Sequence, residues 1–199
     1  MSTITRTGFL GRLAALLAAA LLALTAVVAF TSPASADDLN ATSDDTLAEI
    51  EGQPWPEYGL GDADVDIAAA KLLLIHHGYD PHMDADRPID FDAKMEAAVN
   101  AYQVAGDLAE TGRLDGETWL LLREQTFGEF GPGSSGPVVE AVQRLLNAKF
   151  AHHLDTDGVY GPATEAAVRD AQAHFEIGED GITGKYTFRA LIAYQDYDR

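Results

Sequence analysis

Residues 160–172 read YGPATEAAVRDAQ, and residues 91–103 read FDAKMEAAVNAYQ. The two stretches align at an offset of 69 residues, and the alignment continues without a gap through Gly112 and Gly181 to Leu122 and Leu191. Upstream the offset becomes 72 residues, so the length difference falls in one loop, where such changes are tolerated. A segment that recurs at a long, nearly fixed period predicts one structural unit built twice.

Each repeat predicts three short helices, because its apolar residues recur at helical spacing. In the second repeat the helices begin at Gly136-Pro137, at Gly161-Pro162 and after Thr183-Gly184, and proline suits a first helical position. In the first repeat the third helix begins at Asp115, a good cap for free backbone N–H groups. The predicted core residues are Leu72, Leu73, Val99, Tyr102, Trp119, Leu122, Val139, Val142, Leu145, Leu146, Ala167, Val168, Ala171, Phe175, Thr187, Phe188, Leu191 and Ile192. The sequence therefore predicts an all-α fold of two tandem three-helix repeats.

The first 36 residues predict an export signal. Arg6 and Arg12 precede an uncharged apolar run over 13–30, and Ala34-Ser35-Ala36 has the small residues of a signal-peptidase site. An uncleaved anchor is the alternative, since an apolar run of roughly 18 residues can span a bilayer. The cleavage motif and the acidic residues after it favour removal, and the absence of cysteine excludes a lipid anchor. We therefore expect a secreted protein without a stable membrane anchor.

Removal of the signal would leave 163 residues with a net charge of −21. Such a charge repels nucleic acid, so we expect no nucleic-acid partner. The predicted organisation is a signal at 1–36, an acidic linker at 37–56, a first repeat at 57–125, a glycine-rich linker at 126–135 and a second repeat at 136–199.

The two linkers carry different expectations. The stretch 37–53 is polar and acidic, which predicts a flexible segment. Trp55 follows it and could stack on a sugar, although packing over a domain edge is the more common role of such a residue. The second linker holds Phe127 and Phe130, which indicates that it docks partly on the repeats.

The second repeat has a characteristic set of spaced residues. Asp-Gly steps lie at 157–158 and 180–181, an aromatic–glycine pair at 160–161, and glutamines at 143 and 172. With these residues it resembles the peptidoglycan-binding domain of bacterial wall hydrolases, a three-helix module that holds a protein on murein. The first repeat looks like a diverged copy, in which Lys71, Asp92, Met95 and Asp115 replace the glutamine, glycine, threonine and glycine of the second repeat. The resemblance implies peptidoglycan, through its glycan or its stem peptide, as the partner.

Peptidoglycan offers hydroxyl, amide and carboxylate groups, so its recognition needs placed donors, acceptors and an aromatic face. Backbone N–H groups of the glycine turns and helix N-termini could receive its carboxylates. Each candidate side chain also has a structural alternative as a core residue, a turn former or a first-turn helix residue. The candidate ligand-binding residues are Asp157, Tyr160, Gln172, Asp180, Tyr186 and Thr187.

Known catalytic motifs are missing from the sequence. Without cysteine there is no thiol nucleophile, and neither G-x-S-x-G nor H-E-x-x-H occurs. Histidines at 76, 77, 82, 152 and 153 lie near aspartates, but histidine near a helix C-terminus is favoured by the helix dipole. We therefore expect no metal and no cofactor.

These observations predict a secreted, monomeric, non-catalytic protein that binds peptidoglycan in the cell wall. Once both repeats are assigned, the remaining chain is too short for a separate catalytic fold. Two alternatives stay open: a small wall hydrolase that depends on a metal or on paired carboxylates, and an interaction protein that recruits or inhibits a wall enzyme.

Overall fold

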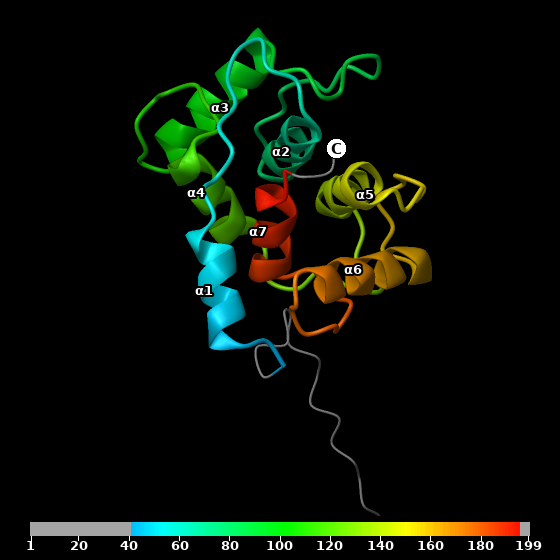
Figure 1. Cartoon of the computed structure of the whole chain (residues 1–199). Coiled ribbons are helices and arrows are strands. Elements are labelled where there is room, and N and C mark those ends of the chain that lie inside the picture. Colours follow the sequence, from blue (N-terminus) through cyan, green and yellow to red (C-terminus); the bar gives the residue numbers. More distant parts are fainter. Residues whose placement is uncertain (1–40, 196–199) are drawn as a thin grey trace, which may run out of the picture. The chain divides into compact units, whose positions relative to one another are not determined.

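The structure is a computed structural model that describes residues 41–195. Regular secondary structure in this range is entirely helical, as the sequence predicts (Figure 1). None of these helices is both long enough and apolar enough to cross a membrane. The predicted export signal lies outside the described residues. The helices are α1 (Asp44–Gly52), α2 (Val65–His76), α3 (Ala93–Ala105), α4 (Gly116–Thr126), α5 (Pro137–Phe150), α6 (Pro162–His174) and α7 (Lys185–Ala193).

The helix starts are confirmed where the sequence places them. Helices α5 and α6 begin at Pro137 and Pro162, and α7 begins directly after Gly184. Helix α4 begins after Asp115, whose side chain accepts a hydrogen bond from the backbone N–H of Thr118. A proline or a short acceptor at these positions satisfies or removes N–H groups that have no partner inside the helix.

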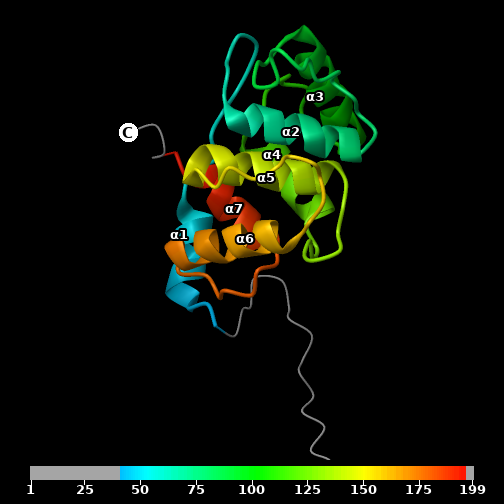
Figure 2. The same cartoon turned by 90° about the vertical axis from the view of Figure 1, so that its right-hand side faces the viewer.

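The two repeats share one hydrophobic core. Helix α2 of the first repeat packs most extensively on α5, its equivalent in the second repeat (Figure 2). Leu73, Val99 and Trp119 from the first repeat and Val142 and Leu191 from the second are all fully buried in this one cluster. A repeat of about 65 residues is near the lower limit for a core of its own, and the shared core removes that limit.

A buried ion pair lies where the two repeats meet. The Nζ of Lys149, near the end of α5, is 2.7 Å from a carboxylate oxygen of Asp66, in the first turn of α2, and both side chains are fully buried. The same ammonium group donates to the carbonyl oxygens of Leu191 at 2.8 Å and Tyr194 at 2.9 Å. Since these carbonyls lie at the end of α7, Lys149 also supplies donors that the helix C-terminus lacks.

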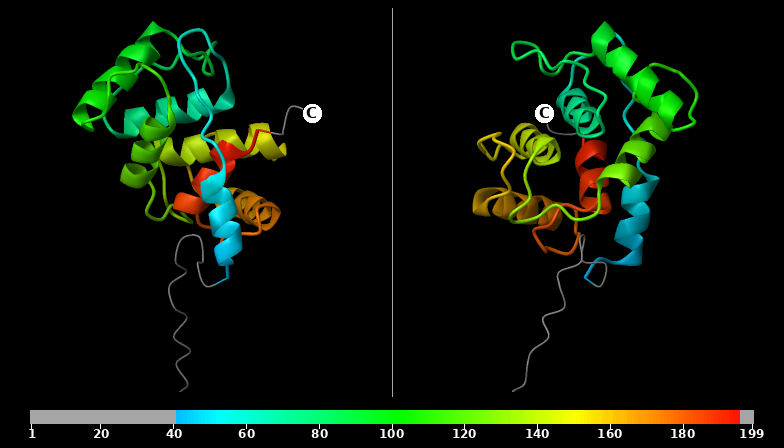
Figure 3. Two further views of the ribbon diagram at one scale, coloured as in Figure 1. Left: turned by 60° about the vertical axis from the view of Figure 1, so that its left-hand side comes forward. Right: turned by 180° about the vertical axis from the view of Figure 1, so that it is seen from behind.

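Residues 44–52 form helix α1 instead of continuing the flexible linker predicted for 37–53. Ser43 caps the helix, Ile50 is its buried residue, and α1 packs along α7 (Figure 3). Just before the helix, Thr42 accepts a hydrogen bond from the backbone N–H of Gly178 at 2.9 Å. Contacts with the second repeat therefore order this segment, although its composition alone predicts no stable structure.

Trp55 packs at the edge of the fold, as expected. Its ring stacks on Trp119 with centroids 6.2 Å apart, and the guanidinium carbon of Arg189 lies 3.8 Å from its centroid. Arg189 also donates to the backbone carbonyl of Gln53. A guanidinium over an indole face is a favourable cation–π arrangement, so this tryptophan ties the segment after α1 to α4 and α7.

Within the glycine-rich segment 126–135, Thr126 ends α4 of the first repeat, and the residues after it pack on the second repeat. Phe127 is buried and stacks on Phe188 with centroids 4.1 Å apart. Antiparallel backbone bridges join Phe130 to Thr183 and Ser135 to Val159. In the first repeat the equivalent bridges join residues 58 and 63 to residues 114 and 90. Each repeat therefore begins with an extended segment that crosses its own two interhelical loops.

Candidate functional site

A buried glutamine closes the loop between α6 and α7. The Nε2 of Gln172 donates to the carboxylate of Asp180 at 2.7 Å, the carbonyl of Ile182 at 3.0 Å and the hydroxyl of Thr187 at 3.1 Å. Its Oε1 accepts the backbone N–H of Gly181 at 2.8 Å. Gly181 has a φ of 72°, in the left-handed region that favours glycine. The motif residues thus form one hydrogen-bonded joint between two helices.

The loop between α5 and α6 is closed in the same way. The Nε2 of Gln143 donates to Asp157 at 3.0 Å, to the carbonyl of Val159 at 3.1 Å and to Thr164 at 3.3 Å. Its Oε1 accepts the N–H of Gly158 at 2.9 Å. Gln143 was not among the predicted site residues, although its spacing to an Asp-Gly step is a signal that the sequence contains.

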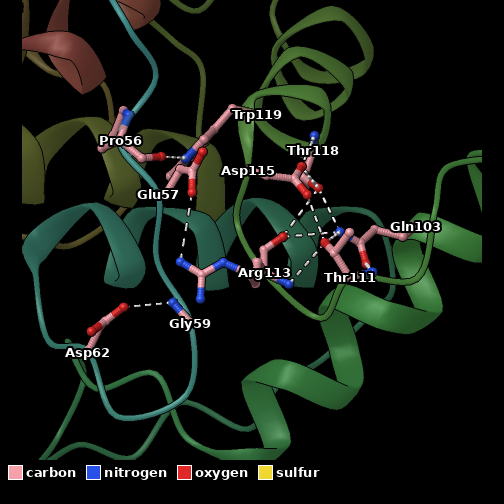
Figure 4. A network of polar contacts seen from close by, with 10 residues as sticks. All are labelled: Pro56, Glu57, Gly59, Asp62, Gln103, Thr111, Arg113, Asp115, Thr118 and Trp119. Carbon is pink, nitrogen blue, oxygen red and sulfur yellow. Dashed lines mark hydrogen bonds and ion pairs between the residues drawn. The ribbon is translucent and has the colours of Figure 1, made fainter.

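The first repeat keeps this joint in one loop. Gln103 donates to the hydroxyls of Thr111 at 2.9 Å and Thr118 at 2.8 Å and to the carbonyl of Arg113 at 3.0 Å (Figure 4). Thr111 here replaces the aspartate of the second repeat. Asp115, the N-cap of α4, accepts from both Thr111 and Thr118. The first repeat therefore retains this joint, with the neutral hydroxyl groups of Thr111 and Thr118 around Gln103.

At the fourth joint, between α2 and α3, Lys71 occupies the position that glutamine has in the other three joints. Lys71 is buried, and this burial lowers the pKa of its ammonium group, while the nearby carboxylates of Asp92, Asp90 and Asp84 oppose the shift. The acidic loop before α3 thus balances a charge that the other joints do not contain. The first repeat differs most from the second at this place.

Tyr160 connects the two joints of the second repeat. Its hydroxyl donates to the carbonyl oxygen of Gly181 at 2.9 Å, and its side chain is buried. Burial raises the pKa of Tyr160 well above its ordinary value, so the phenol stays a neutral donor. The structure thereby places Tyr160 with Gln172, Asp180 and Thr187 in one cluster and leaves Asp157 at the neighbouring joint.

The predicted ligand-binding residues differ in exposure. Tyr160, Gln172 and Thr187 are buried and bonded inside the protein. Asp157 is exposed, and Asp180 and Tyr186 are half-buried. The binding role of all six stays a prediction, but only the last three present side-chain surface to a ligand.

Asp157 offers a charged acceptor on this surface. The hydrogen bond from Gln143 and the backbone N–H of Val159 hold the pKa of its carboxyl below the ordinary value. The group is therefore ionised at neutral pH, and its second oxygen can accept hydrogen bonds from hydroxyl or amide groups.

A separate pocket lies between α1 and the C-terminal ends of α6 and α7. It encloses about 510 Å³, and its lining includes Ile50, His174, Phe175 and Tyr194. None of the six predicted residues lines it. Sequence reasoning missed this pocket because its walls come from three distant segments, one of which was interpreted as a linker.

The histidines contact rings and hydroxyls in the structure. His77 pairs with the hydroxyl of Thr126 at 2.8 Å, and burial lowers the pKa of its imidazole. His152 and His174 pack against Phe150. Within residues 41–195, no group of three or more His, Asp or Glu side chains is placed to hold a metal ion.

Comparison with known proteins assigns the repeats. The model of the putative peptidoglycan binding domain matches residues 64–122 and 135–191, together more than half of the chain. The zinc D-Ala-D-Ala carboxypeptidase of Streptomyces albus G is 34% identical over 109 residues, which are 53% of this chain and 40% of that protein. The N-acetylmuramoyl-L-alanine amidase CwlM of Mycobacterium tuberculosis is 31% identical over 110 residues, which are 51% of this chain and 27% of that protein. The chain thus spans less than half the length of either relative.

The matched ranges coincide with the two structural repeats, from the first turn of α2 to α4 and from the start of α5 to α7. This agreement includes the diverged first copy with Lys71 in place of glutamine. The chain belongs to the family of putative peptidoglycan-binding domains, of which it contains two copies.

Proposed function

We propose that this chain is a secreted, non-catalytic protein that binds peptidoglycan in the cell wall. The observation that carries the proposal is the pair of peptidoglycan-binding domains over 64–122 and 135–191. The export signal predicted over 1–36 supports secretion.

The assignment of the described helices to the two repeats and to α1 supports a binding role without catalysis. Helices α2 to α7 all belong to the two repeats, and α1 packs on α7. Residues 41–195 are thus accounted for by the binding modules and the segment that covers them. A binding module needs only a presented surface, whereas a hydrolase also needs catalytic groups held in a cleft.

The second repeat is the better candidate for the binding surface. It presents Asp157, Asp180 and Tyr186 around its loops. The first repeat has Thr111 and Glu117 at the positions of Asp180 and Tyr186. It therefore lacks both the second aspartate and the aromatic ring. In its joint between α2 and α3, the charged Lys71 and nearby carboxylates replace a neutral glutamine.

Sedimentation of residues 37–199 with insoluble purified peptidoglycan tests the proposal. Chitin and cellulose serve as control polymers, and turbidity is followed in the same tubes. We expect selective sedimentation with peptidoglycan at constant turbidity. A falling turbidity would indicate a hydrolase, and protein left wholly in the supernatant would point to a protein partner.

A matched pair of variants then locates the surface. Tyr186→Ala removes the half-buried aromatic ring of the second repeat, and Glu117→Ala changes the equivalent position of the first. We expect Tyr186→Ala to weaken sedimentation by about tenfold, a typical loss for one aromatic contact, and Glu117→Ala to leave it unchanged. Equal losses in both variants would contradict an asymmetric surface.

A further inference from the structure

The pocket beside α1 is a candidate site that lies only partly within the region that the family model covers. Its wall from α1 comes from residues 44–53, outside both family matches, and its other walls come from the C-terminal ends of α6 and α7. A volume of about 510 Å³ is within the range of small-ligand pockets. The pocket could therefore hold a group of sugar or amino-acid size.

Aromatic rings line one side of this pocket. The rings of His174 and Tyr194 have centroids 5.1 Å apart, and those of Phe175 and Tyr194 are 5.7 Å apart. Ile50 and Ala190 supply an apolar floor from α1 and α7. Aromatic faces carry partial negative charge, so they attract a cation as well as an aliphatic chain.

The charges at the pocket have a single sign. Its lining contains Glu49 from α1 and Glu176 from the loop after α6, and no lysine or arginine is among the described lining residues. Both glutamates are exposed, and neither forms an ion pair in the described part of the chain. Two carboxylates beside aromatic faces select a positively charged group and disfavour a carboxylate.

We propose that this pocket binds a primary ammonium group of the wall polymer, with the aliphatic carbons beside the amine on the aromatic wall. The inference rests on the proposed function, because it names the chemistry that a second contact with peptidoglycan would use. Two sources offer this group: the side-chain amine of a diamino acid in the stem peptide, and the amine of a glucosamine without its acetyl group.

Sedimentation with chemically acetylated peptidoglycan tests this proposal. Acetylation of the free amines removes their charge, so we expect binding of residues 37–199 to fall about tenfold, a typical effect of one charge-assisted contact. The variant Glu49→Gln/Glu176→Gln should bind untreated peptidoglycan about tenfold more weakly and should not respond to acetylation. The variant Glu110→Gln/Glu117→Gln changes two exposed glutamates of the first repeat and should behave as the unmodified protein does.

Soluble probes distinguish the two sources. In NMR titrations, Nα-acetyl-lysine amide represents the peptide amine, and a glucosamine oligosaccharide represents the glycan amine. If only one probe changes the chemical shifts of His174 and Tyr194, and the changes are lost in Glu49→Gln/Glu176→Gln, that probe identifies the source of the bound amine. An N-acetylglucosamine oligosaccharide, which has no amine, should cause no shift there.

The outcomes separate this inference from the proposed function. Equal sedimentation of all proteins with untreated and acetylated peptidoglycan would contradict the binding of an ammonium group in the pocket, but it would not contradict the proposed function. A fall on acetylation that is as large in Glu49→Gln/Glu176→Gln as in the unmodified protein would reveal general charge repulsion and would also overturn it. Failure to sediment with either sample would overturn the proposed function and this inference with it.

Discussion

Gln172 uses its side-chain amide entirely inside the protein. It makes three donor contacts and accepts the N–H of Gly181, so its replacement leaves buried polar groups without partners. We expect Gln172→Leu to lower the free energy of unfolding by about 2–4 kcal/mol, since each unsatisfied buried group costs about 1–3 kcal/mol. Urea denaturation followed by circular dichroism measures the change.

Gln125→Leu is the control, because this glutamine is exposed and accepts one hydrogen bond, from the hydroxyl of Tyr102. It should cost less than about 1 kcal/mol. A Gln172→Leu protein that is fully stable but no longer sediments with peptidoglycan would favour the ligand-binding role predicted from the sequence over the structural role.

Asp115 predicts a pH dependence of stability. Burial alone would raise the pKa of this carboxyl, but hydrogen bonds from Thr111 and Thr118 outweigh it and hold the pKa below its ordinary value. A depressed pKa contributes stability that is present above the unfolded value of about 3.9 and is lost as the pH falls through the folded value. Asp115→Asn keeps a good N-cap but cannot titrate.

We therefore expect the urea midpoint of Asp115→Asn to fall less between pH 5 and pH 2.5 than that of the unmodified protein. Burial raises the pKa of Asp66, and this works in the opposite direction, but it is common to both proteins and cancels in the comparison. Asp107→Asn changes an exposed aspartate of the same repeat and is the control. Identical pH profiles for Asp115→Asn and the unmodified protein would contradict the prediction.

At the scale of elements, the contact of α2 with α5 depends on a pair of charges. Burial lowers the pKa of Lys149 and raises that of Asp66, because both charges have left water. Lys149→Met removes one charge, leaves the other buried and takes the donor from the end of α7. We expect it to cost about 3–5 kcal/mol, as is typical when one partner of a buried pair is removed.

A double-mutant cycle tests this coupling. Asp66→Leu/Lys149→Met replaces the pair by apolar side chains, and such replacements are often nearly neutral. We expect the double variant to be more stable than Lys149→Met alone, although the carbonyls of α7 still lack their donor and Tyr58 and Gln195 lose the carboxylate to which they donate. Additive losses in urea denaturation would show that the two side chains are not energetically coupled.

Helix positions could be predicted where the signal is local. Gly136-Pro137, Gly161-Pro162 and Asp115 mark helix starts through groups next to them in the chain, and the structure confirms all three. Helix α1 escaped prediction because its sequence is acidic and it buries chiefly Ile50. Its order comes from contacts with residues more than a hundred positions away, such as that of Thr42 with Gly178, which no local pattern reveals.

The same distinction holds for the candidate site. The repeat locates the loops that carry Asp157, Asp180 and Tyr186, because the motif spacing is fixed within one module. It does not show that Gln172 and Thr187 point inward, since a glutamine that closes a turn and one that binds a ligand look alike in sequence. The pocket beside α1 depends on tertiary packing and has no sequence signal of its own.

At the scale of the whole molecule, the shared core predicts that both repeats unfold together. Cooperative units follow contiguous buried contacts, and one cluster includes Leu73 of the first repeat and Leu191 of the second. Both tryptophans, Trp55 and Trp119, precede the second repeat in the sequence, but Trp55 contacts Arg189 and Trp119 packs near Phe188, both in α7. Their fluorescence therefore reports on the first repeat and its contact with α7, whereas circular dichroism reports on all helices. We expect the two urea transitions to coincide.

Gln172→Leu sharpens this test, because it destabilises the second repeat at a joint whose hydrogen bonds include neither tryptophan. If the repeats are one cooperative unit, the variant shifts the fluorescence midpoint as much as the circular dichroism midpoint. Two independent repeats would split the circular dichroism curve into two steps, and the fluorescence curve would show a second step as well, because both tryptophans contact α7. Equal shifts would mean that the diverged first repeat and the second repeat stabilise each other. The first repeat could then lose its own binding residues while its half of the core stayed indispensable to the surface that the second repeat presents.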